Sequence, residues 1–546
     1  MLPLDGASLS ISKVTQYSKP LSGTVSLSSE PEILDNINKS HQWVNQAVAE
    51  NQSIYGITTL FGGLADIKID AANAAELQEI LIASHHAGVG EYLAKEDVKA
   101  AMMVRTNSLA RGASGVSLAL LNRYIDYINH DAIPMVREYG SIGASGDLIP
   151  LATIAGAVMG LNDRYSLYFD NQIVPASIVL ETLGLEKYSL APKEGLALIN
   201  GTSMMAGHAC RSLVQFETLF RLNFYNHAIA TQALQGNSES FSEFIHQQKP
   251  HSGQQWAAEH FFKLLKGSQS VSNCTPSYSQ NHPNELIQDR YSIRCLPQFI
   301  GPIIEHVQTF TKQLTTEINS TTDNPIIDNK DGHFYHGGNF LGQHLSIGLD
   351  QLRQFISLLT KHMDAQIALM MMPEFSRGLP ASLIGQSQSQ LSLGLKPLQI
   401  AGNSILPLIE HLGNSIVDRF PVHAEQFNQN INSQGMSAAL LSRQAITLWT
   451  RHLTISSIIT TQAIDLRCHQ MLGHYDARAI LSEPCRSYYE TIKSLLIKSP
   501  TFDRPLVFND QDQALATLVE TVSADLFNES SQLGEVTSAL ESPFLT

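Results

Sequence analysis

The sequence predicts a long helical bundle preceded by a region of loops and medium helices. Two segments carry apolar residues at alternating spacings of four and three, which places them on one stripe of a helix. The first stripe is Ile303, Val307, Phe310, Leu314 and Ile318, and the second is Leu345, Leu349, Leu352, Ile356, Leu359 and Met363. Because helices of this length need partner helices on several sides, we expect a bundle that is shared between subunits.

Turn residues divide the rest of the chain. Residues 320–339 are rich in turn formers, with Asp323-Asn324-Pro325 and Gly337-Gly338 as the strongest, so they predict a structured connection between two antiparallel helices. Glycine-rich breaks at 62–63, 88–90 and 140–146 mark the first part of the chain as the part that builds the site. We therefore predict a first domain at 1–210 and a helical-bundle domain at 211–546, with a flexible loop at 385–395.

The composition favours small-molecule partners. The 546-residue chain has 35 Lys and Arg against 50 Asp and Glu, a net charge of −15, which argues against a general nucleic-acid or anionic-membrane surface. Its five cysteines are scattered and lack C-x-x-C pairing, as expected of reduced thiols in the cytoplasm rather than of a disulfide or zinc framework. No targeting pattern is visible, and the longest apolar run, 148–161, is too short to span a bilayer.

Residues 140–150, GSIGASGDLIP, give the strongest indication of chemistry. Gly146 offers a backbone nitrogen without a Cβ beside it and can adopt the strained conformation that brings this nitrogen onto the carbonyl carbon of Ala144. A five-membered ring then closes, and loss of the Ser145 hydroxyl as water leaves an exocyclic double bond. The methylidene carbon of such a group is an electrophile that no ordinary side chain supplies.

The tripeptide Ala-Ser-Gly is weak evidence by itself, because the chain contains it twice. At 113–115 it lies in a small-residue break between apolar helical stretches, where close helix packing explains it. The eleven residues around Ser145 are far more specific. They resemble the signature of the aromatic amino acid ammonia-lyase family, whose prosthetic group is a self-formed methylidene-imidazolone (MIO).

This resemblance implies a mainly α fold of the fumarase and histidase type, in which a mixed N-terminal domain carries the MIO loop beside a long central bundle. It implies a homotetramer whose active sites are shared by loops of three subunits. It also implies a small aromatic amino acid as substrate, and an MIO formed from Ala144, Ser145 and Gly146 as the cofactor, with no metal and no added organic cofactor.

Tyr55 lies in IYGITTLFGG, which resembles the family's loop carrying the tyrosine that removes the β-proton of the substrate. A phenol titrates near ~10, so Tyr55 can act as a base only where its neighbours lower its pKa. The family usually has glycine where this chain has Leu60, a difference that would stiffen or narrow the loop and leave the phenol in place.

Three further segments match the family in its order. Residues 193–202 resemble the strip whose asparagine, here Asn200, touches the amino group or the prosthetic ring. Residues 288–298 begin with Gln288 and resemble the strip whose tyrosine and arginine, here Tyr291 and Arg294, hold the catalytic machinery and the substrate carboxylate. An arginine fork suits this role because it can donate two parallel hydrogen bonds to a carboxylate.

The third segment, residues 336–340, resembles the strip in which two neighbouring residues complete the pocket. Its asparagine, here Asn339, supports the carboxylate site. Its phenylalanine, here Phe340, lines the pocket beside the electrophile. Together the matches extend from Tyr55 to about residue 435.

Ser84 and His85 occupy the place where the family reads the substrate's side chain. Phenylalanine-specific members carry apolar residues there, whereas histidine lyases and several tyrosine-directed enzymes carry Ser-His. Phenylalanine would leave a buried His85 unpaired and is therefore disfavoured. Histidine lyases also place a glutamate where this chain has Gln429, and a neutral amide cannot pair with an imidazolium. The sequence thus favours a tyrosine ammonia-lyase that forms p-coumarate, with histidine, which gives urocanate, as the second candidate.

Three other functions stay open. A 2,3-aminomutase would share the first half of the reaction and return the amine to the β-carbon. A noncatalytic helical scaffold would keep Ser145 as an ordinary serine. A lyase of the fumarase and aspartase type also eliminates ammonia from a helical bundle, but this chain lacks its Ser-rich GSS-type loop.

Overall fold

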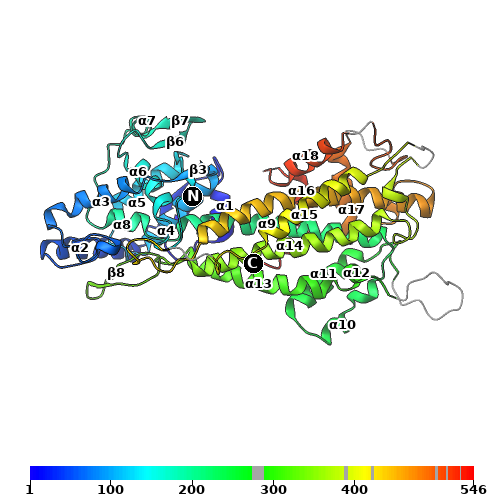
Figure 1. Ribbon diagram of the computed structural model, residues 1–546, viewed down its shortest axis with the longest axis horizontal. Helices are drawn as coiled ribbons and strands as arrows, with labels where there is room; N and C mark the ends of the chain where they lie inside the picture. Colours follow the sequence, from blue (N-terminus) through cyan, green and yellow to red (C-terminus); the bar gives the residue numbers. More distant parts are fainter. Residues whose placement is uncertain are drawn as a thin grey trace. The chain divides into compact units, whose positions relative to one another are not determined.

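The computed structural model describes residues 1–272, 288–386, 391–419, 423–497, 502–511, 514–528 and 530–545, and helices dominate them (Figure 1). The chain forms two compact units. Unit 1 comprises Met1–Val214, Phe310–Asp350 and Ser415–Ser442, and unit 2 comprises Gln215–Thr309, Gln351–Asn414 and Arg443–Thr546. Because most of these boundaries fall within long helices, the units divide the chain differently from the predicted domains 1–210 and 211–546, which stay a prediction.

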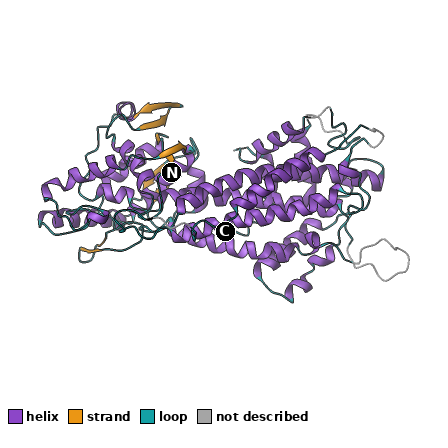
Figure 2. Cartoon of the chain, viewed as in Figure 1, coloured by secondary structure: helices purple, strands orange, loops and turns teal. Residues whose placement is uncertain are grey.

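Unit 1 contains the strands of the described chain, in four small sheets (orange in Figure 2). Strand β1 (Leu2–Leu4) pairs in parallel with β2 (Val25–Leu27). The other pairs are antiparallel: β3 (Val89–Tyr92) with β5 (Arg137–Tyr139), β6 (Ser166–Phe169) with both β4 (Ile133–Pro134) and β7 (Gln172–Pro175), and β8 (Ile326–Asp328) with β9 (His333–Tyr335). The β8–β9 hairpin occupies the turn-rich connection predicted at 320–339.

Helix α4 is buried from Asp97 to Ala110 and packs against α1 and α5. Helix α6 starts after Asp147 and ends at Gly160, whose φ of +66° is the left-handed conformation that closes many helices. The helices that lie wholly in this unit are α1 (Ile11–Tyr17), α2 (Pro31–Ala49), α3 (Ala74–Ser84), α4 (Lys95–Ala110), α5 (Leu118–Asn129), α6 (Leu148–Met159), α7 (Ala176–Leu183) and α8 (Glu194–Ile199), with 3₁₀ turns η1 (Gly62–Leu64) and η2 (Ala71–Asn73).

Four long helices form the bundle, and both predicted apolar stripes lie on two of them. The helices are α9 (Ser203–Ala233), α13 (Leu296–Glu317), α14 (Gln343–Met371) and α16 (Gly435–Leu472). Every residue of both stripes is at most 2% exposed. The first stripe runs along α13 and ends one residue beyond it, and the second lies on α14. The prediction of two long amphipathic helices is therefore confirmed.

Unit 2 adds helices around its part of the bundle. Asn226 of α9 donates from Nδ2 to the Leu453 carbonyl of α16 at 3.2 Å, and the Tyr488 hydroxyl of α17 donates to Asn226 Oδ1 at 2.6 Å, so one buried amide ties three helices together. The remaining elements of this unit are α10 (Glu243–Gln247), α11 (Ser252–Leu265), α12 (Tyr291–Arg294), α15 (Lys396–Leu412), α17 (Glu483–Leu496), α18 (Leu515–Leu526) and α19 (Gln532–Thr537), with η3 (Ser238–Phe241), η4 (Ala381–Leu383) and η5 (Ala477–Ala479).

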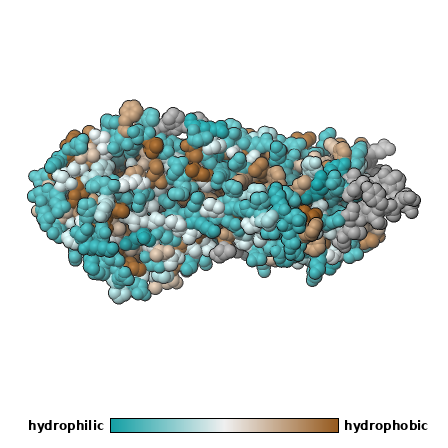
Figure 3. All heavy atoms as spheres, turned by 90° about the horizontal axis from the view of Figure 1, so that it is seen from below, coloured by the Kyte–Doolittle hydropathy of each residue, from teal (hydrophilic) through white to brown (hydrophobic). Residues whose placement is uncertain are grey.

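The face drawn in Figure 3 is mostly hydrophilic, with hydrophobic residues placed among polar ones. Within the described ranges, no helix has both the length and the apolar character that crossing a membrane requires. Part of the predicted loop at 385–395, residues 387–390, lies outside the described residues, as does Cys274. The other four cysteines are free thiols.

Candidate active site

The Ala144-Ser145-Gly146 tripeptide lies in a tight turn between β5 and α6. The Ser141 hydroxyl accepts from the Gly143 amide at 3.2 Å and donates to Asp147 Oδ1 at 2.8 Å, which closes the turn across the tripeptide. Ser433 donates to the Gly143 carbonyl from its amide at 3.1 Å and from its hydroxyl at 3.0 Å. A segment almost 300 residues further along the chain therefore fixes the approach to the reactive serine.

Gly146 packs directly on the backbone of Gly201. Its φ is +71°, a conformation that L side chains rarely adopt, and a Cβ placed there would lie closer than 3.0 Å to the backbone of Gly201. The Asp147 amide donates to the Gly201 carbonyl at 2.8 Å, whereas the Gly146 amide donates to no described residue. The Gly146 nitrogen, which would form the ring, therefore lies against the Gly201 backbone and donates no hydrogen bond to the described residues.

Two amide side chains donate hydrogen bonds to Ser145, one to its carbonyl and one to its hydroxyl. Asn200, the residue that follows α8, donates from Nδ2 to the Ser145 carbonyl at 2.9 Å. Gln429 donates from Nε2 to the Ser145 hydroxyl at 3.0 Å. The other end of the Asn200 amide, Oδ1, is buried and has no hydrogen-bond partner in the part of the chain that the structure describes. Asn200 therefore supports the tripeptide with its donor and keeps an acceptor open.

Asp147 anchors the turn to the long helix α9. Its Oδ2 accepts from the Met205 amide at 2.9 Å. Burial raises the pKa of this carboxyl to about 6, against the opposing effects of hydrogen bonds from Met205 and Ser141 and of the charge on Arg105. The hydrogen bonds from Ser141 and Met205 fix the orientation of this carboxyl group.

Tyr55 lies on the loop between α2 and η1, in the same unit. Its hydroxyl accepts from the Gly62 amide at 3.1 Å, and its ring meets Phe61 edge to face with centroids 6.4 Å apart. Burial, and secondarily the charge of Glu425, raise the pKa of the phenol, while the Gly62 hydrogen bond lowers it. The sequence predicts a base whose pKa is depressed, and within the single chain the shift has the opposite direction.

Glu425 is the residue of this site that sequence reasoning missed. It belongs to the segment that carries Gln429, and a Cβ placed at Gly62 would overlap its carboxylate. Glu425, Gln426 and Phe427 all have positive φ values, so this segment is a compact turn. No periodicity or motif indicates that this turn packs on the Tyr55 loop, because the two lie about 370 residues apart in the chain.

Gln78 of α3 connects the Tyr55 loop to the helix that carries Asn200. It is fully buried, donates to the Gly56 carbonyl at 3.1 Å and accepts from the Leu196 amide of α8 at 3.0 Å. The predicted specificity residues follow at the end of the same helix. Helix α3 therefore contacts both the loop that carries the predicted base and the predicted amine-binding strip.

Ser84 is exposed and His85 is partly buried at the C-terminal end of α3. His85 Nδ1 lies 2.8 Å from the Leu81 carbonyl, so this nitrogen is the donor and Nε2 is the free acceptor. The ring of the next residue, His86, stacks on the ring of Tyr165, with centroids 4.3 Å apart. His85 Nε2 has no hydrogen-bond partner among the described residues and could accept a hydrogen bond from a substrate.

Asn339 and Phe340 follow the β8–β9 hairpin in unit 1. The Asn339 side chain is exposed and donates from Nδ2 to the Thr321 carbonyl at 3.2 Å, while Phe340 is partly buried. This contact ties the predicted carboxylate strip to the chain that leads into the hairpin.

The other predicted carboxylate residues lie in unit 2, on and beside α12. Gln288 is exposed, and Tyr291 is 73% exposed, with the Arg294 guanidinium 4.6 Å above its ring. Arg294 donates from Nε to the Asp289 carbonyl at 3.0 Å, and its terminal nitrogens donate to none of the described residues. The fork of Arg294 is thus oriented by its own loop and open to a carboxylate.

Two residues of α14 donate hydrogen bonds to the backbone of α12. His362 Nε2 and Gln366 Nε2 both donate to the Ser292 carbonyl, at 2.8 and 2.7 Å. Because Gln366 uses its nitrogen here, its oxygen accepts from His227 Nδ1 at 2.9 Å. Burial lowers the pKa of His362 to about 4, so this support is neutral under ordinary conditions.

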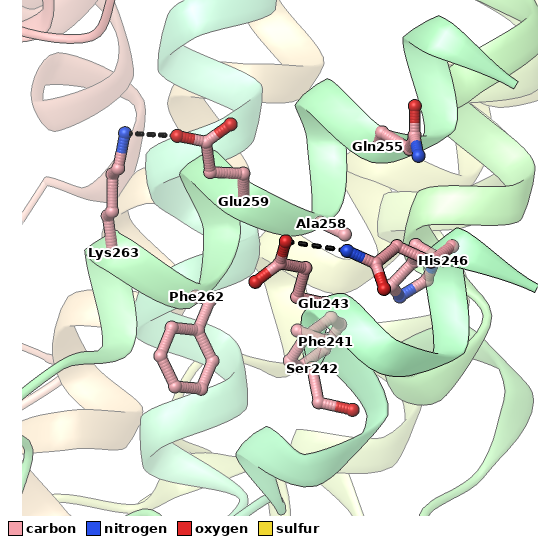
Figure 4. Close-up of a pocket in the computed structure, with 10 residues that line it drawn as sticks. Phe241, Ser242, Glu243, His246, Gln255, Ala258, Glu259, Phe262 and Lys263 are labelled. Atoms are coloured by element: carbon pink, nitrogen blue, oxygen red, sulfur yellow. Dashed lines mark hydrogen bonds and ion pairs between the residues drawn. The ribbon is translucent and has the colours of Figure 1, made fainter. Parts of the chain in front are cut away.

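A cavity of about 680 Å³ lies elsewhere in unit 2, between α10 and α11 (Figure 4). Its charged groups already pair within it, since Lys263 donates to Glu259 at 2.6 Å and Gln247 donates to Glu243 at 2.7 Å. It contains none of the predicted reactive residues. Across the described ranges, no cluster of three or more His, Cys, Asp or Glu residues could hold a metal ion.

Comparisons with known proteins identify the family of this chain. A model of the aromatic amino acid lyase family matches residues 9–493. A phenylalanine ammonia-lyase of Nostoc punctiforme is 47% identical over 502 residues, covering 92% of this chain and 88% of the relative. An aromatic ammonia-lyase of Loktanella atrilutea is 39% identical over 541 residues, covering 99% and 98%. The crystal structure of tyrosine aminomutase from Streptomyces globisporus matches with a TM-score of 0.87 at 26% identity, covering 99% of each chain.

The family match spans every residue predicted for the site, from Tyr55 to Gln429. The structural likeness covers nearly the whole chain and confirms the predicted mainly α, histidase-like fold. The chain belongs to the aromatic amino acid lyase family and is a carbon–nitrogen lyase.

Proposed function

We propose that this enzyme eliminates ammonia from an aromatic L-amino acid by means of an MIO formed from Ala144, Ser145 and Gly146. The observation that carries this proposal is the pair of amide donors on Ser145, Asn200 on its carbonyl and Gln429 on its hydroxyl. In the proposed reaction, each hydrogen bond has a role. The donor on the hydroxyl assists its loss, and the donor on the carbonyl stabilises the electrons that the carbonyl withdraws.

The residues fit the formation of the ring. The free Gly146 nitrogen attacks the carbonyl carbon of Ala144, whose oxygen leaves as water with the amide protons of Ser145 and Gly146. The Ser145 hydroxyl then leaves with the Cα proton as a second water, which creates the Cα–Cβ double bond. The Gln429 amide donates to the departing oxygen, and the packing of Gly146 on Gly201 leaves no space for a side chain at the ring-forming residue.

Once formed, the methylidene carbon supplies an electrophile for the substrate's α-amine. The open Oδ1 of Asn200 accepts a hydrogen bond from that amine while its Nδ2 holds the Ser145 carbonyl. Tyr55 removes the β-proton, which requires a cationic or hydrogen-bonding group beyond Gly62 to lower the pKa of its phenol. By the family resemblance, the Arg294 fork of α12, which lies over the Tyr291 ring, binds the carboxylate, and Gln288, Asn339 and Phe340 belong to the substrate site.

We propose L-tyrosine as the preferred substrate and p-coumarate as the product. The free Nε2 of His85, beside Ser84, is the acceptor that a phenol hydroxyl requires, and Gln429 is engaged with Ser145 as a neutral amide. Phenylalanine is the second candidate, which the 47% identical relative named phenylalanine ammonia-lyase favours. Histidine lyase and 2,3-aminomutase activities are decided by the same product analysis.

The proposal is tested by intact mass and by ultraviolet assays with tyrosine, phenylalanine and histidine. We expect a mass lower than the translated chain by two waters, and formation of a conjugated acid fastest from tyrosine. Ser145→Ala has no hydroxyl to eliminate, so it can lose one water at most and should lose activity, whereas Tyr55→Phe should keep the dehydrated mass and lose activity. An undehydrated wild-type mass would overturn the proposal, and a β-amino acid as the main product would identify a mutase.

The assembly and the location of the enzyme also belong to this proposal. A homotetramer with shared active sites is supported by the family resemblance alone. A cytoplasmic location is supported only by the scattered cysteines.

A further inference from the structure

Arg105 lies in the middle of α4 and is the largest buried cation of unit 1. Its side chain is 1% exposed, and the helix around it is buried for several turns. An arginine is rarely placed in such an interior unless its donors have fixed acceptors. The groups that accept hydrogen bonds from Arg105 therefore indicate the role of this side chain.

The guanidinium holds two strips of the active site at once. Its Nε and Nη2 donate to the Ala197 carbonyl, the former at 2.9 Å, and Nη2 also donates to the Asn200 carbonyl at 3.1 Å. Its Nη1 donates to the Thr322 hydroxyl at 3.1 Å. The first set fixes the end of α8, where the Asn200 side chain turns toward Ser145.

The second contact reaches the strip that carries Asn339. Thr322 follows Thr321, whose carbonyl accepts from the Asn339 side chain at 3.2 Å. A single planar group therefore spans from the residue that supports the tripeptide carbonyl to the segment that supports the substrate carboxylate. Only a forked donor has this reach, because the lone nitrogen of a lysine cannot serve both sides.

The residues around the guanidinium provide both space and compensating charge for it. A Cβ placed at Gly201 would overlap Nη1 of Arg105, so the glycine that pairs with Gly146 also makes room for this cation. Asp323 and Asp147 attract its charge. Asp323 also pairs with Lys193 at 2.6 Å, with both side chains fully buried. The charge of Arg105 is thus compensated without any direct ion pair that would draw it away from the carbonyls.

We propose that Arg105 is a positioning residue for the reaction, which sets the spacing between the Asn200 strip and the Asn339 strip through its simultaneous bonds to Asn200 and Thr322. This inference rests on the proposed function, because it assigns Arg105 to the geometry of that site. It touches neither the substrate nor the tripeptide. Its effect is on how well the substrate is aligned, and hence on kcat more than on KM.

The test compares the full-length variants Arg105→Met and Arg105→Lys with the wild type. Arg353→Met is the matched control, because Arg353 is also fully buried and also donates to backbone carbonyls, those of Leu412 and Asn414 in unit 2. For each protein, intact mass gives the dehydrated fraction, and kcat and KM are measured per dehydrated chain with the substrate that the wild type turns over fastest.

We expect Arg105→Met to lower kcat at least tenfold with a smaller change in KM, and Arg105→Lys to recover part of the loss. Arg353→Met should lower the Tm by a similar amount and keep kcat within twofold. A kcat of Arg105→Met within twofold of the wild type overturns the inference, as does an equal loss in Arg353→Met. If Arg105→Met does not fold, Arg105→Lys decides, since an unchanged kcat there overturns the inference as well. A wild-type mass that retains both waters overturns the proposed function itself, and this inference with it.

Discussion

Replacement of Asn200 by leucine should separate catalysis from stability. Leucine has nearly the same size and lacks both the donor to Ser145 and the buried Oδ1, which has no partner in the described chain. Loss of the donor leaves the Ser145 carbonyl unpaired, a cost of about 1–3 kcal/mol, but the same change removes an unpaired acceptor that carries a comparable penalty. We therefore expect the free energy of unfolding to change by no more than about 1 kcal/mol.

Activity should respond very differently. In the proposed reaction, electrons collect on the Ser145 carbonyl when the substrate amine is activated. Removal of one hydrogen-bond donor to such an oxygen typically costs about 2.7–4 kcal/mol of transition-state stabilisation. This corresponds to a decrease of kcat by about 100- to 1000-fold. The assay is the ultraviolet rate per dehydrated chain, with the dehydrated fraction taken from intact mass and stability from the Tm.

Asn107 provides the matched control, since it is a fully buried asparagine of α4 whose amide is satisfied at both ends. It accepts from the Gly6 amide at 2.9 Å and donates to the Ile318 carbonyl at 2.9 Å. Asn107→Leu leaves the Gly6 amide and the Ile318 carbonyl without these hydrogen bonds. The Tm should therefore fall, while kcat per folded chain should not change. A kcat of Asn200→Leu within threefold of the wild type, or a loss explained by a lower Tm, would refute the reasoning.

Three other substitutions test separate features of the molecule. Gly146→Ala places a Cβ against the Gly201 backbone at a φ of +71°, so the purified chain should retain both waters; Gly184→Ala, at a φ of +64° with open space around it, should cost only about 1–2 kcal/mol and keep the dehydrated mass. His452 is buried and its pKa is lowered from 6.5 to about 4, so the folded state disfavours its protonation. As the pH falls from 6.5 to 4, the wild type should lose about 3 kcal/mol of unfolding free energy that His452→Leu does not lose, a difference seen in denaturant titrations at both pH values. Glu425→Gln removes a charge that raises the pKa of Tyr55, so the acidic limb of kcat/KM should shift to lower pH; a shift to higher pH would contradict the role of Tyr55 as a base.

Sequence reasoning predicted the bundle from the two apolar stripes, and their burial confirmed it. It also predicts a reactive tripeptide at 144–146, because the eleven-residue context is local and specific. It did not identify Arg105, although a charged residue within the buried helix α4, in the stretch AAMMVRTNSLA, is a usable signal for a buried polar contact. It placed Tyr55 in a loop, yet the direction of its pKa shift depends on Glu425, which no local pattern connects to it.

The sequence by itself determined the long helices and predicts the chemistry of the tripeptide, because helix periodicity and the conformational freedom of Gly146 are properties of neighbouring residues. Only the tertiary structure decided which groups act on Ser145. Asn200 and Gln429 lie 55 and 284 residues away, and the backbone contact of Gly146 with Gly201 joins two segments that share no pattern. Such contacts are set by how α4, α6 and α8 pack around buried polar groups, and packing depends on the shapes and charges of side chains that are distant in the chain.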